Sequence, residues 1–326
     1  MASLMYRQAL NQALREEMKR DETVFVIGEE VAHYEGAYRV TEDLWEEFGD
    51  KRVKDTPIAE EVIAGLGVGA AMAGLRPVVE MMTVNFSLLA LDQIVNHAAK
   101  LLYMSGGQVK VPMVIRMPEG AGMQLGAQHS QMFEAWFAHV PGLKVVGPGT
   151  PGDAKGLLKS AIRDDNPVIF MENQLLYSWK GEVPEDDYTV PIGKADIKRE
   201  GADITIITYL RMVRESLKAA DALAAEGVNA EVLDLRTLRP MDVETIVKSV
   251  KKTHRAVVVE EDWPYYGVGA QVVDFIQCHA FDHLDAPILR VTAEDCPMPY
   301  AKELELAALP DEGKIITTVK KVLAVE

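Results

Sequence analysis

Short apolar segments alternate with longer amphipathic segments along most of this chain. Continuous apolar runs of this length predict strands that are buried on both faces, as in parallel sheets. In the first half of the chain these runs cover Val24 to Glu30, Arg76 to Met82, Val111 to Met117, Leu143 to Gly149 and Asn166 to Asn173. The alternation of strands with helices predicts an α/β fold with mostly parallel sheets.

The segments between these runs have helical character. Leu10, Leu14 and Met18 form one apolar stripe at helical spacing. Helices in the first half are expected over residues 1–20, near Thr41 to Phe48, from Ser87 to Met104 and over Thr150 to Asp165. The third of these is apolar on most of its circumference and is expected to be buried. The fourth opens with a threonine cap and a proline at the first helical position.

Residues 178–202 interrupt this alternation. The stretch is charged and contains two prolines and three glycines without periodicity, which is typical of a linker or crossing loop. A second, smaller set of alternating strands and helices follows. We therefore expect a first domain over residues 1–185, a linker over 186–202 and a second α/β domain over 203–326.

Composition narrows the possible partners and compartments. The chain has 326 residues, of which 50 are acidic and 34 basic, so its net charge is −16. A phosphate-backbone partner is therefore not expected. The two cysteines, Cys278 and Cys296, have neither metal-ligand spacing nor a disulfide pattern, which favours a reducing compartment. The first 20 residues lack an apolar signal core, and no apolar run is long enough to span a bilayer.

The sequence DTPIAEE, Asp55 to Glu61, stands at the start of an unusually apolar helix. Acidic residues in a first helical turn usually complement the helix dipole. Alternatively, a carboxylate at the mouth of a buried site has a raised pKa and can act as an acid or base. The glycines of GLGVGAAMAG behind it lie inside the helical pattern, so close packing explains them better than dinucleotide binding does.

Other candidate reactive groups follow predicted strands. A glycine-rich loop from Arg116 to Gln131 contains His129, which a structural role could equally explain. Glu29 and Arg116 are further candidates in the first half. In the second half RTLRP (Arg236 to Pro240) and EEDWPYYGVG (Glu260 to Gly269) are polar strand ends that could form either a site or an interface.

One motif is absent. The chain has no GDG followed at a distance by Asn, the usual metal and diphosphate signature of thiamin enzymes, and no P-loop. A diphosphate cofactor would therefore need another chain to hold its phosphates and metal.

A series of colinear blocks carries a family resemblance over nearly the whole chain. They read DTPIAE, GLRPVVEMMTVNF, AQHSQ, PGLKVV, DAKGLLKSAIRDDNPV, ENQLLY, LRTLRPMD, GVGAQ and PMPYAKELE. In these blocks the chain resembles the beta subunits of the pyruvate dehydrogenase first component, which are transketolase-like thiamin diphosphate enzymes. The resemblance implies a transketolase-like pyrimidine-binding domain followed by a transketolase C-terminal-like domain.

The resemblance also implies roles for individual residues. Glu60 matches the family glutamate that hydrogen-bonds the cofactor's aminopyrimidine ring, and Phe86 matches the aromatic residue packed on that ring. Glu29 and Met82 are expected nearby. His129 matches an active-site histidine that acts on the substrate carboxylate, a reaction intermediate or the incoming lipoyl dithiolane. A structural potassium site is implied at Met113, Ala161, Ile162, Asp164 and Asn166, since hard cations prefer oxygen ligands.

The implied function is thiamin-dependent oxidative decarboxylation of pyruvate, with transfer of the acyl group to a lipoyl arm. The implied assembly is an α2β2 heterotetramer whose alpha subunit holds magnesium and the diphosphate, bound to the subunit-binding and lipoyl domains of an acetyltransferase. Branched-chain 2-oxoacid and acetoin dehydrogenase beta subunits are alternatives, as is a non-catalytic assembly subunit. The expected location is the bacterial cytoplasm, or an organelle interior if this is a mature chain.

Overall fold

The computed structural model describes residues 1–324 and divides into two compact units. The first unit comprises Met1–Glu119 and Trp136–Ile192. The second comprises Gly120–Ala135 and the chain from Gly193 onward. Residues 120–135, which interrupt the first unit in the sequence, therefore pack with the second unit.

The first unit is built on a parallel sheet in which the strands β6-β7-β5-β4-β2-β3 are neighbours in that order. Their bounds are β2 Val24–Gly28, β3 Val53–Asp55, β4 Arg76–Glu80, β5 Val114–Glu119, β6 Lys144–Val146 and β7 Val168–Asn173. Gly28 pairs in register with Asp55 of β3 and with Glu80 of β4. The prediction of mostly parallel α/β sheets is confirmed, and three adjacent strands end together at this point.

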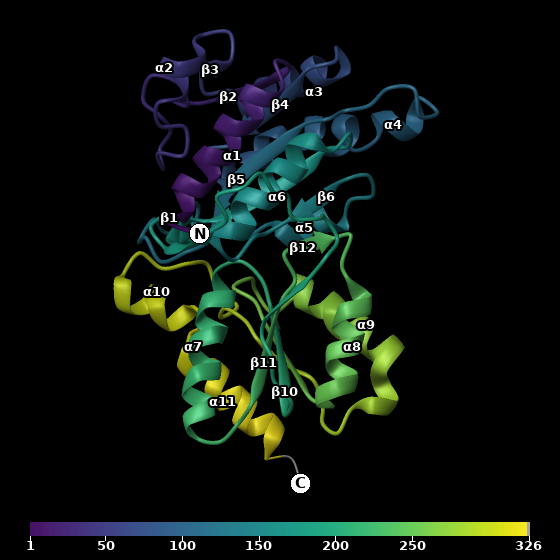
Figure 1. Ribbon diagram of the computed structural model, residues 1–326. Helices are drawn as coiled ribbons and strands as arrows, with labels where there is room; N and C mark the ends of the chain where they lie inside the picture. Colours follow the sequence, from purple (N-terminus) through teal and green to yellow (C-terminus); the bar gives the residue numbers. More distant parts are fainter. Residues whose placement is uncertain (325–326) are drawn as a thin grey trace. The chain divides into compact units, whose positions relative to one another are not determined.

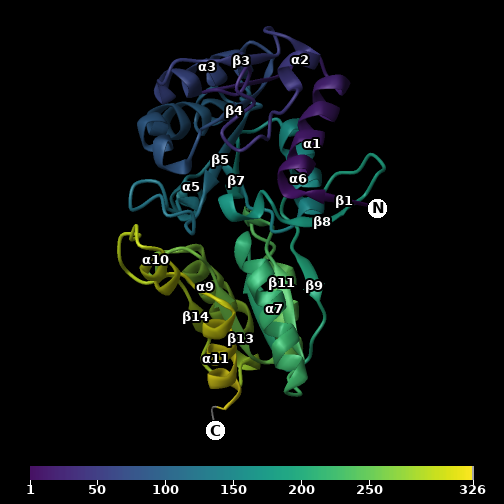
Figure 2. The ribbon, with the colours of Figure 1, turned by 90° about the vertical axis from the view of Figure 1, so that its left-hand side faces the viewer.

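Helices and short segments surround this sheet. The helices α1 and α6 lie side by side (Figure 2). The apolar stripe of Leu10, Leu14 and Met18 is buried in the core, as its spacing predicts. Thr150 accepts a hydrogen bond of 3.2 Å from the backbone N–H of Asp153, so the expected cap is present. The remaining bounds are β1 Ala2–Met5, α1 Tyr6–Arg20, α2 Leu44–Phe48, α3 Glu60–Met72, α5 Glu134–His139, α6 Pro151–Arg163, the 3₁₀ turn η3 Gln174–Leu176 and β8 Lys180–Val183.

The small-residue helix α3 packs tightly on the sheet. A Cβ on Gly67 would lie 2.6 Å from Cγ2 of Val79 and 2.9 Å from Cε of Met113. No side chain fits at that separation, so close packing explains this glycine. A Cβ on Gly69, two residues on, would meet nothing within 4 Å. Tight packing thus applies to one face of the helix only.

The prediction of one continuous, buried helix from Ser87 to Met104 is wrong. The structure has a 3₁₀ segment η1 at Val84–Ala90, a π segment η2 at Asp92–Ala98 and a short α4 at Leu101–Met104. The Ser87 hydroxyl donates a 2.5 Å hydrogen bond to the carbonyl of Val84, a local bond that competes with regular helix geometry. Tyr103 is 90% exposed, so part of the apolar surface of this segment faces solvent and is not buried in the core.

The second unit has a sheet with strand order β14-β13-β10-β11-β9, in which only the edge strand β9 is antiparallel. Helices α7 and α11 cover one face of this sheet, and α8 and α9 cover the other (Figure 1). The strand bounds are β9 Asp196–Arg199, β10 Ile204–Thr208, β11 Ala230–Asp234, β12 Thr237–Arg239, β13 Ala256–Val259 and β14 Leu289–Val291. The helical bounds are α7 Arg211–Ala225, α8 Val243–Thr253, α9 Val268–Ala280, η4 Phe281–His283, α10 Lys302–Ala308 and α11 Glu312–Leu323.

Two local expectations for the second unit differ from the structure. Residues 186–202, expected as a linker, contain β9, which pairs with β11 at the sheet edge. RTLRP, expected as the end of a strand, instead contains a separate short strand, β12, after β11, and Arg236 between the two adopts a left-handed φ of 54°. No helix among residues 1–324 combines the length and apolar character needed to cross a bilayer.

Candidate active site

The residues expected to contact the pyrimidine lie near one edge of the first sheet. Glu29 directly follows β2, Met82 follows β4 by two residues, and Glu60 is the first residue of α3, which follows β3. Phe86 lies in η1, which packs against α3. Because β3, β2 and β4 are adjacent and parallel, their carboxyl ends meet at this edge, where open α/β sheets hold ligands.

Glu60 is buried, unlike its neighbour. Its residue is 4% exposed, whereas Glu61 in the same helical turn is exposed to solvent. Within residues 1–324 no group donates a hydrogen bond to the Glu60 carboxylate. Favourable interaction with the helix dipole does not require burial, so the dipole alone does not account for this position. The Glu60 oxygens are not among the fully buried atoms that lack a partner, so they reach the surface of the chain, where a ligand could bring its own donor.

Glu29 is the second buried acid at this edge. Burial raises the pKa of its carboxyl, and the negative charge of Glu60 raises it further. The two carboxyl groups are therefore close enough to interact electrostatically. Two neighbouring acids in a dry site favour retention of a proton, which is a common arrangement in acid and base chemistry.

The loop that carries Glu29 is fixed from the next strand. The two carboxylate oxygens of Asp55 accept backbone hydrogen bonds of 2.7 Å from Ala32 and 3.3 Å from His33. The N–H of Thr56 donates to the carbonyl of Gly28 at 3.0 Å. The first residue of the DTPIAEE motif thus holds the β2 loop beside the start of α3.

Phe86 and Met82 are half-buried at the same edge. The N–H of Phe86 donates to the carbonyl of Thr83 at 3.2 Å, which sets the turn that begins η1. An aromatic ring and a thioether at a partly open edge are suitable packing surfaces for a flat heterocycle.

Arg116, a candidate reactive group in the sequence, is fully buried inside the first unit. Its guanidinium is paired with the carboxylates of Glu172 and Glu80. The hydroxyl of Tyr177 donates a further hydrogen bond of 2.7 Å to Glu172. A guanidinium held between two carboxylates has a structural role, because its charge and donors are already satisfied.

His129 lies in the segment that packs with the second unit. It is half-buried, and its backbone N–H donates to the carbonyl of Gly126 at 3.3 Å. Ser130 beside it is buried. The base of the loop is closed by a hydrogen bond of 3.4 Å from the N–H of Gly120 to the carbonyl of Gln131. The imidazole is therefore carried on a compact, closed loop.

The oxygens of the implied potassium site already accept hydrogen bonds. One Nη of Arg76 donates to the carbonyls of Ile162 and Asp164 at 3.0 and 2.9 Å. The ammonium group of Lys144 contacts the Asp164 carboxylate, whose other oxygen accepts from the N–H and side-chain amide of Asn166 at 2.9 and 3.0 Å. The carbonyls of Met113 and Ala161 each accept from a backbone N–H. These oxygens are of the type that a potassium ion prefers, but two cationic side chains already contact them.

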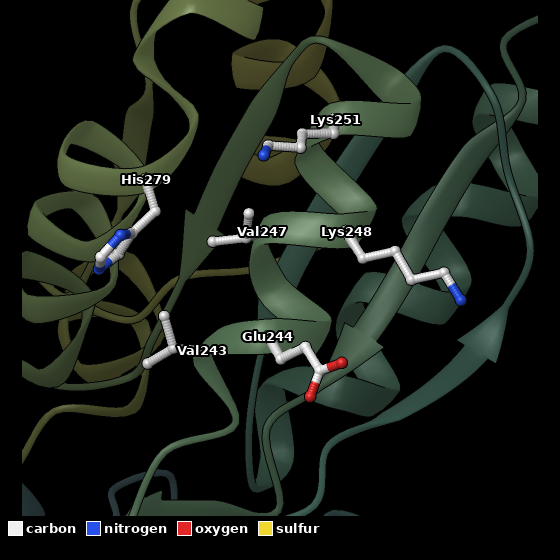
Figure 3. Close-up of a pocket in the computed structure, with 6 residues that line it drawn as sticks. All are labelled: Val243, Glu244, Val247, Lys248, Lys251 and His279. Atoms are coloured by element: carbon white, nitrogen blue, oxygen red, sulfur yellow. The ribbon is translucent and has the colours of Figure 1, made fainter.

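A separate pocket lies between α8 and α9 in the second unit (Figure 3). It is lined by Val243, Glu244, Val247, Lys248, Lys251 and His279. In the close-up the Lys248 ammonium points away from His279, whereas the Lys251 ammonium lies on the side of the pocket that faces His279. None of the residues expected to bind cofactor or substrate lines this pocket.

Comparison with known proteins identifies the family. Residues 2–180 match the family of transketolase pyrimidine-binding domains. Residues 193–315 match the family of transketolase C-terminal domains. The protein "Pyruvate dehydrogenase E1 component subunit beta" of Rhizobium meliloti (strain 1021) is 55% identical over 323 residues, covering 99% of this chain and 70% of its own. The chain belongs to the pyruvate dehydrogenase E1 beta-subunit family. The resemblance stated from the sequence blocks is confirmed.

Other members of this E1 beta family match over similar lengths. The mitochondrial E1 beta subunit of Homo sapiens is 54% identical over 322 residues, covering 97% of this chain and 90% of its own.

A solved structure described as "Split gene transketolase, inactive beta4 tetramer" superposes with a TM-score of 0.82 at 23% identity, covering 99% of both chains. The transketolase-like fold predicted for the two domains is thereby confirmed.

Proposed function

We propose that this chain is the beta subunit of a pyruvate dehydrogenase first component and completes a thiamin diphosphate site together with an alpha subunit. The observation that carries the proposal is the buried carboxylate of Glu60, which has no hydrogen-bond donor within residues 1–324. It stands at the carboxyl edge of a domain that matches the transketolase pyrimidine-binding family. An aminopyrimidine offers a ring nitrogen at which such a carboxyl can share a proton.

When bound, thiamin diphosphate supplies a carbon nucleophile that adds to the carbonyl of a 2-oxoacid. The contribution of this chain is to hold one proton at the pyrimidine. Glu60 donates or shares a proton at the ring nitrogen. Glu29 lies beside it, and its own carboxyl has a pKa raised by burial and by the Glu60 charge. Phe86 and Met82 form the packing surface that orients the ring.

His129 is the second reactive group of the proposal. An imidazole can hold or release a proton near neutral pH. It would act at the substrate carboxylate or at the sulfur of the incoming lipoyl group, which accepts the acyl group from the cofactor. The closed loop that carries His129 limits where that proton can be delivered.

The alpha subunit is the proposed occupant of an exposed apolar surface of the first unit. Val62 and Leu66 lie four residues apart on α3, and both side chains are exposed. Further exposed apolar residues are Ile58 before the helix, Leu89 in η1 and Tyr103 in α4. Exposed apolar residues in this number are typical of a protein interface. The alpha chain would supply the magnesium and diphosphate ligands, in an α2β2 tetramer that binds the lipoyl and subunit-binding domains of an acetyltransferase.

A structural potassium ion is a further part of the proposal. At the carboxyl end of α6 it would have to displace the ammonium group of Lys144 from Asp164. Thermal unfolding in potassium, sodium and choline chloride tests this point. A midpoint that rises with potassium alone supports the site, and Asp164→Asn should abolish that rise. Equal midpoints in all three salts would reject it.

The central test mixes this chain with a cognate alpha subunit and measures 2-oxoacid-dependent acyl transfer to a lipoyl domain. Pyruvate should be the preferred substrate in a panel that includes branched-chain 2-oxoacids and acetoin. Preference for one of the latter would favour the alternative dehydrogenases. No turnover with any substrate, despite tetramer formation, would favour a non-catalytic assembly subunit. Turnover by the beta chain alone would contradict a site completed by two chains.

A further inference from the structure

The loop that carries His129 is bonded to the second unit through backbone N–H groups. The carboxylate of Glu305 accepts hydrogen bonds from the N–H of Gly122 at 2.9 Å and from the N–H of Gln124 at 3.1 Å. The carboxylate of Glu261 accepts from the N–H of Ala121 at 2.9 Å. Three backbone donors within four residues are thus satisfied by two acidic side chains.

The loop backbone adopts the conformations that these bonds require. Gly122 and Gln124 have φ values of 108° and 59°, in the left-handed region that turns successive N–H groups toward one side. Such a turn makes a small concave surface that accepts an anion. Here the anion is a side chain of the same protein, and Glu305 is 0% exposed.

Glu305 is oriented by the element that carries it. It lies in α10, Lys302–Ala308, where Glu303 and Leu304 are exposed and Glu305 is buried. No cationic side chain within residues 1–324 forms an ion pair with Glu305. The charge of this carboxylate is therefore balanced by loop N–H groups, which makes the bonds charge-assisted and strong.

Tyr300 makes a second contact with the same loop. A Cβ on Gly126 would lie 2.4 Å from Cζ of Tyr300, so the tyrosine ring lies directly on the backbone of Gly126. The carbonyl of Gly126 accepts the backbone hydrogen bond of His129. The block PMPYAKELE, which contains Tyr300 and Glu305, thus contacts the block AQHSQ on the residues just before the histidine.

Apolar contacts complete the attachment. Ala121 of the loop packs in a small buried cluster with Met298, Ala308 and Leu309. Glu261 is itself held by Arg211, whose Nε donates to the other carboxylate oxygen at 2.5 Å. The loop is therefore bound at its first residues by packing and by two buried acids.

We infer that Glu305, with Tyr300, is a positioning residue that sets the place of His129 for acyl transfer. The inference rests on the proposed function and takes the second of the two roles given there to His129, the one at the sulfur of the incoming lipoyl group. In this role, residues of the second unit that lie far from His129 in the sequence contribute to the acyl-transfer step. Glu305 contacts neither substrate nor cofactor in this role and acts only through the loop backbone.

The test uses the full beta chain assembled with its alpha subunit and compares Glu305→Gln with Glu303→Gln, an exposed control on the same helix. In Glu305→Gln one acceptor oxygen becomes an amide that faces backbone N–H groups. Amide hydrogen exchange in the peptide covering residues 120–131 should accelerate by about 10-fold or more, because local opening becomes easier. The control should exchange as the wild type does, and exchange at equal rates in both variants would overturn the inference.

Kinetics provide a second readout. Acyl transfer to a lipoyl domain should fall by up to about 100-fold in Glu305→Gln, the cost expected of a small misplacement. Pyruvate-dependent reduction of an artificial electron acceptor should change little, because that assay omits the transfer step. Combined with His129→Ala, the Glu305 change should cost nothing further, since both act through one group. Fully additive losses would show that Glu305 does not act through His129.

A second variant covers the case in which Glu305→Gln does not fold. Tyr300 is 73% exposed, so Tyr300→Ala should leave the midpoint of thermal unfolding within a degree or two of wild type, as surface changes usually do. It should still accelerate exchange at residues 120–131 and slow acyl transfer, and unchanged exchange would overturn the inference. Hydrogen exchange needs no turnover. A failure of the proposed function, seen as no 2-oxoacid turnover by the wild-type tetramer, is therefore distinguishable from a failure of this inference.

Discussion

The guanidinium of Arg116 and the carboxylate of Glu172 form two hydrogen bonds of 2.7 Å in a fully buried pair on the adjacent parallel strands β5 and β7. Glu80 on β4 contacts the same guanidinium from the other side. The pair ties together three strands close to the edge that carries the candidate site. Its geometry satisfies the donors of arginine as a lysine could not.

Removing Glu172 from this pair should be destabilising although Glu80 still balances the charge of Arg116. We expect Glu172→Gln to lower the free energy of unfolding by about 1–3 kcal/mol, because one of two buried, charge-assisted hydrogen bonds to the guanidinium is lost. Chemical denaturation of the purified chain measures this. Asp165→Asn is a suitable control, because Asp165 bonds Arg76 and Lys110 at a half-exposed position and should cost less than about 1 kcal/mol. Equal losses in the two variants would show that burial of the Arg116 pair is unimportant.

The Glu60 carboxyl should be needed for cofactor activation and not for folding. We expect Glu60→Gln in the assembled tetramer to slow deuterium exchange at the thiazolium carbon by about 100-fold or more, the contribution typical of a positioned proton-transfer group. The thermal unfolding midpoint and tetramer mass should stay near wild type. Glu61→Gln, an exposed neighbour in the same helical turn, should leave exchange unchanged. Wild-type exchange in Glu60→Gln would remove the residue from its proposed role.

The buried acids of the second unit predict a pH-dependent stability. Burial, reinforced by the charges of Glu134 and Glu260, raises the pKa of Asp262 to about 9. Between pH 4 and 9 the folded chain thus retains a proton that the unfolded chain releases, so stability should fall as pH rises, by at most about 1.4 kcal/mol per pH unit. Below about pH 4 both states are protonated and the difference disappears.

Asp262→Asn tests that sign. In the wild type the backbone N–H of Trp263 donates a 2.7 Å hydrogen bond to the Asp262 carboxylate. The amide of asparagine keeps an oxygen that can accept this bond. The variant should be more stable than wild type at pH 8 and similar at pH 4, in denaturant titrations of the purified chain at several pH values. Parallel pH profiles for the two proteins would show that Asp262 does not carry the effect.

The two glycines of α3 should respond oppositely to the same change. Gly67→Ala should destabilise the chain by about 1–3 kcal/mol, because the new methyl would overlap Val79 and Met113. Gly69→Ala should stabilise the isolated chain by up to about 1 kcal/mol, because that position is open and alanine favours helix. Thermal and chemical unfolding of both variants measure the difference. A stabilising Gly67→Ala would contradict the tight packing of this helix face.

The fold could be predicted from the sequence to a large extent, since buried parallel strands are continuous apolar runs. The strands at residues 24–28 and 168–173 lie within the expected segments for that reason. The burial expected for residues 87–104 is wrong because an apolar circumference indicates contact with something apolar and does not say whether this is the same chain. The exposed Tyr103 belongs to this surface.

The candidate site was predictable only in part. Glu60 stands out because an acid precedes an apolar helix, and the family resemblance gives it a role. Glu305 gives no such signal, because its partners are backbone N–H groups, which every residue except proline carries. A local sequence pattern also cannot show that residues 120–135 pack with the second unit, since this depends on contacts distant in the chain. Glu172 offered one clue, a lone carboxylate inside an apolar strand, which indicates a buried cation nearby.

The exposed apolar residues of α3 have a consequence for how the protein must be produced. Val62 and Leu66 of α3, and Ile58 just before the helix, are exposed on the separate chain. Copies made in excess of the alpha subunit would therefore self-associate through these residues. Matched synthesis of the two subunits would keep that pool small. Recombinant preparation should therefore succeed best by co-expression, with the yield of dispersed protein set by the scarcer chain.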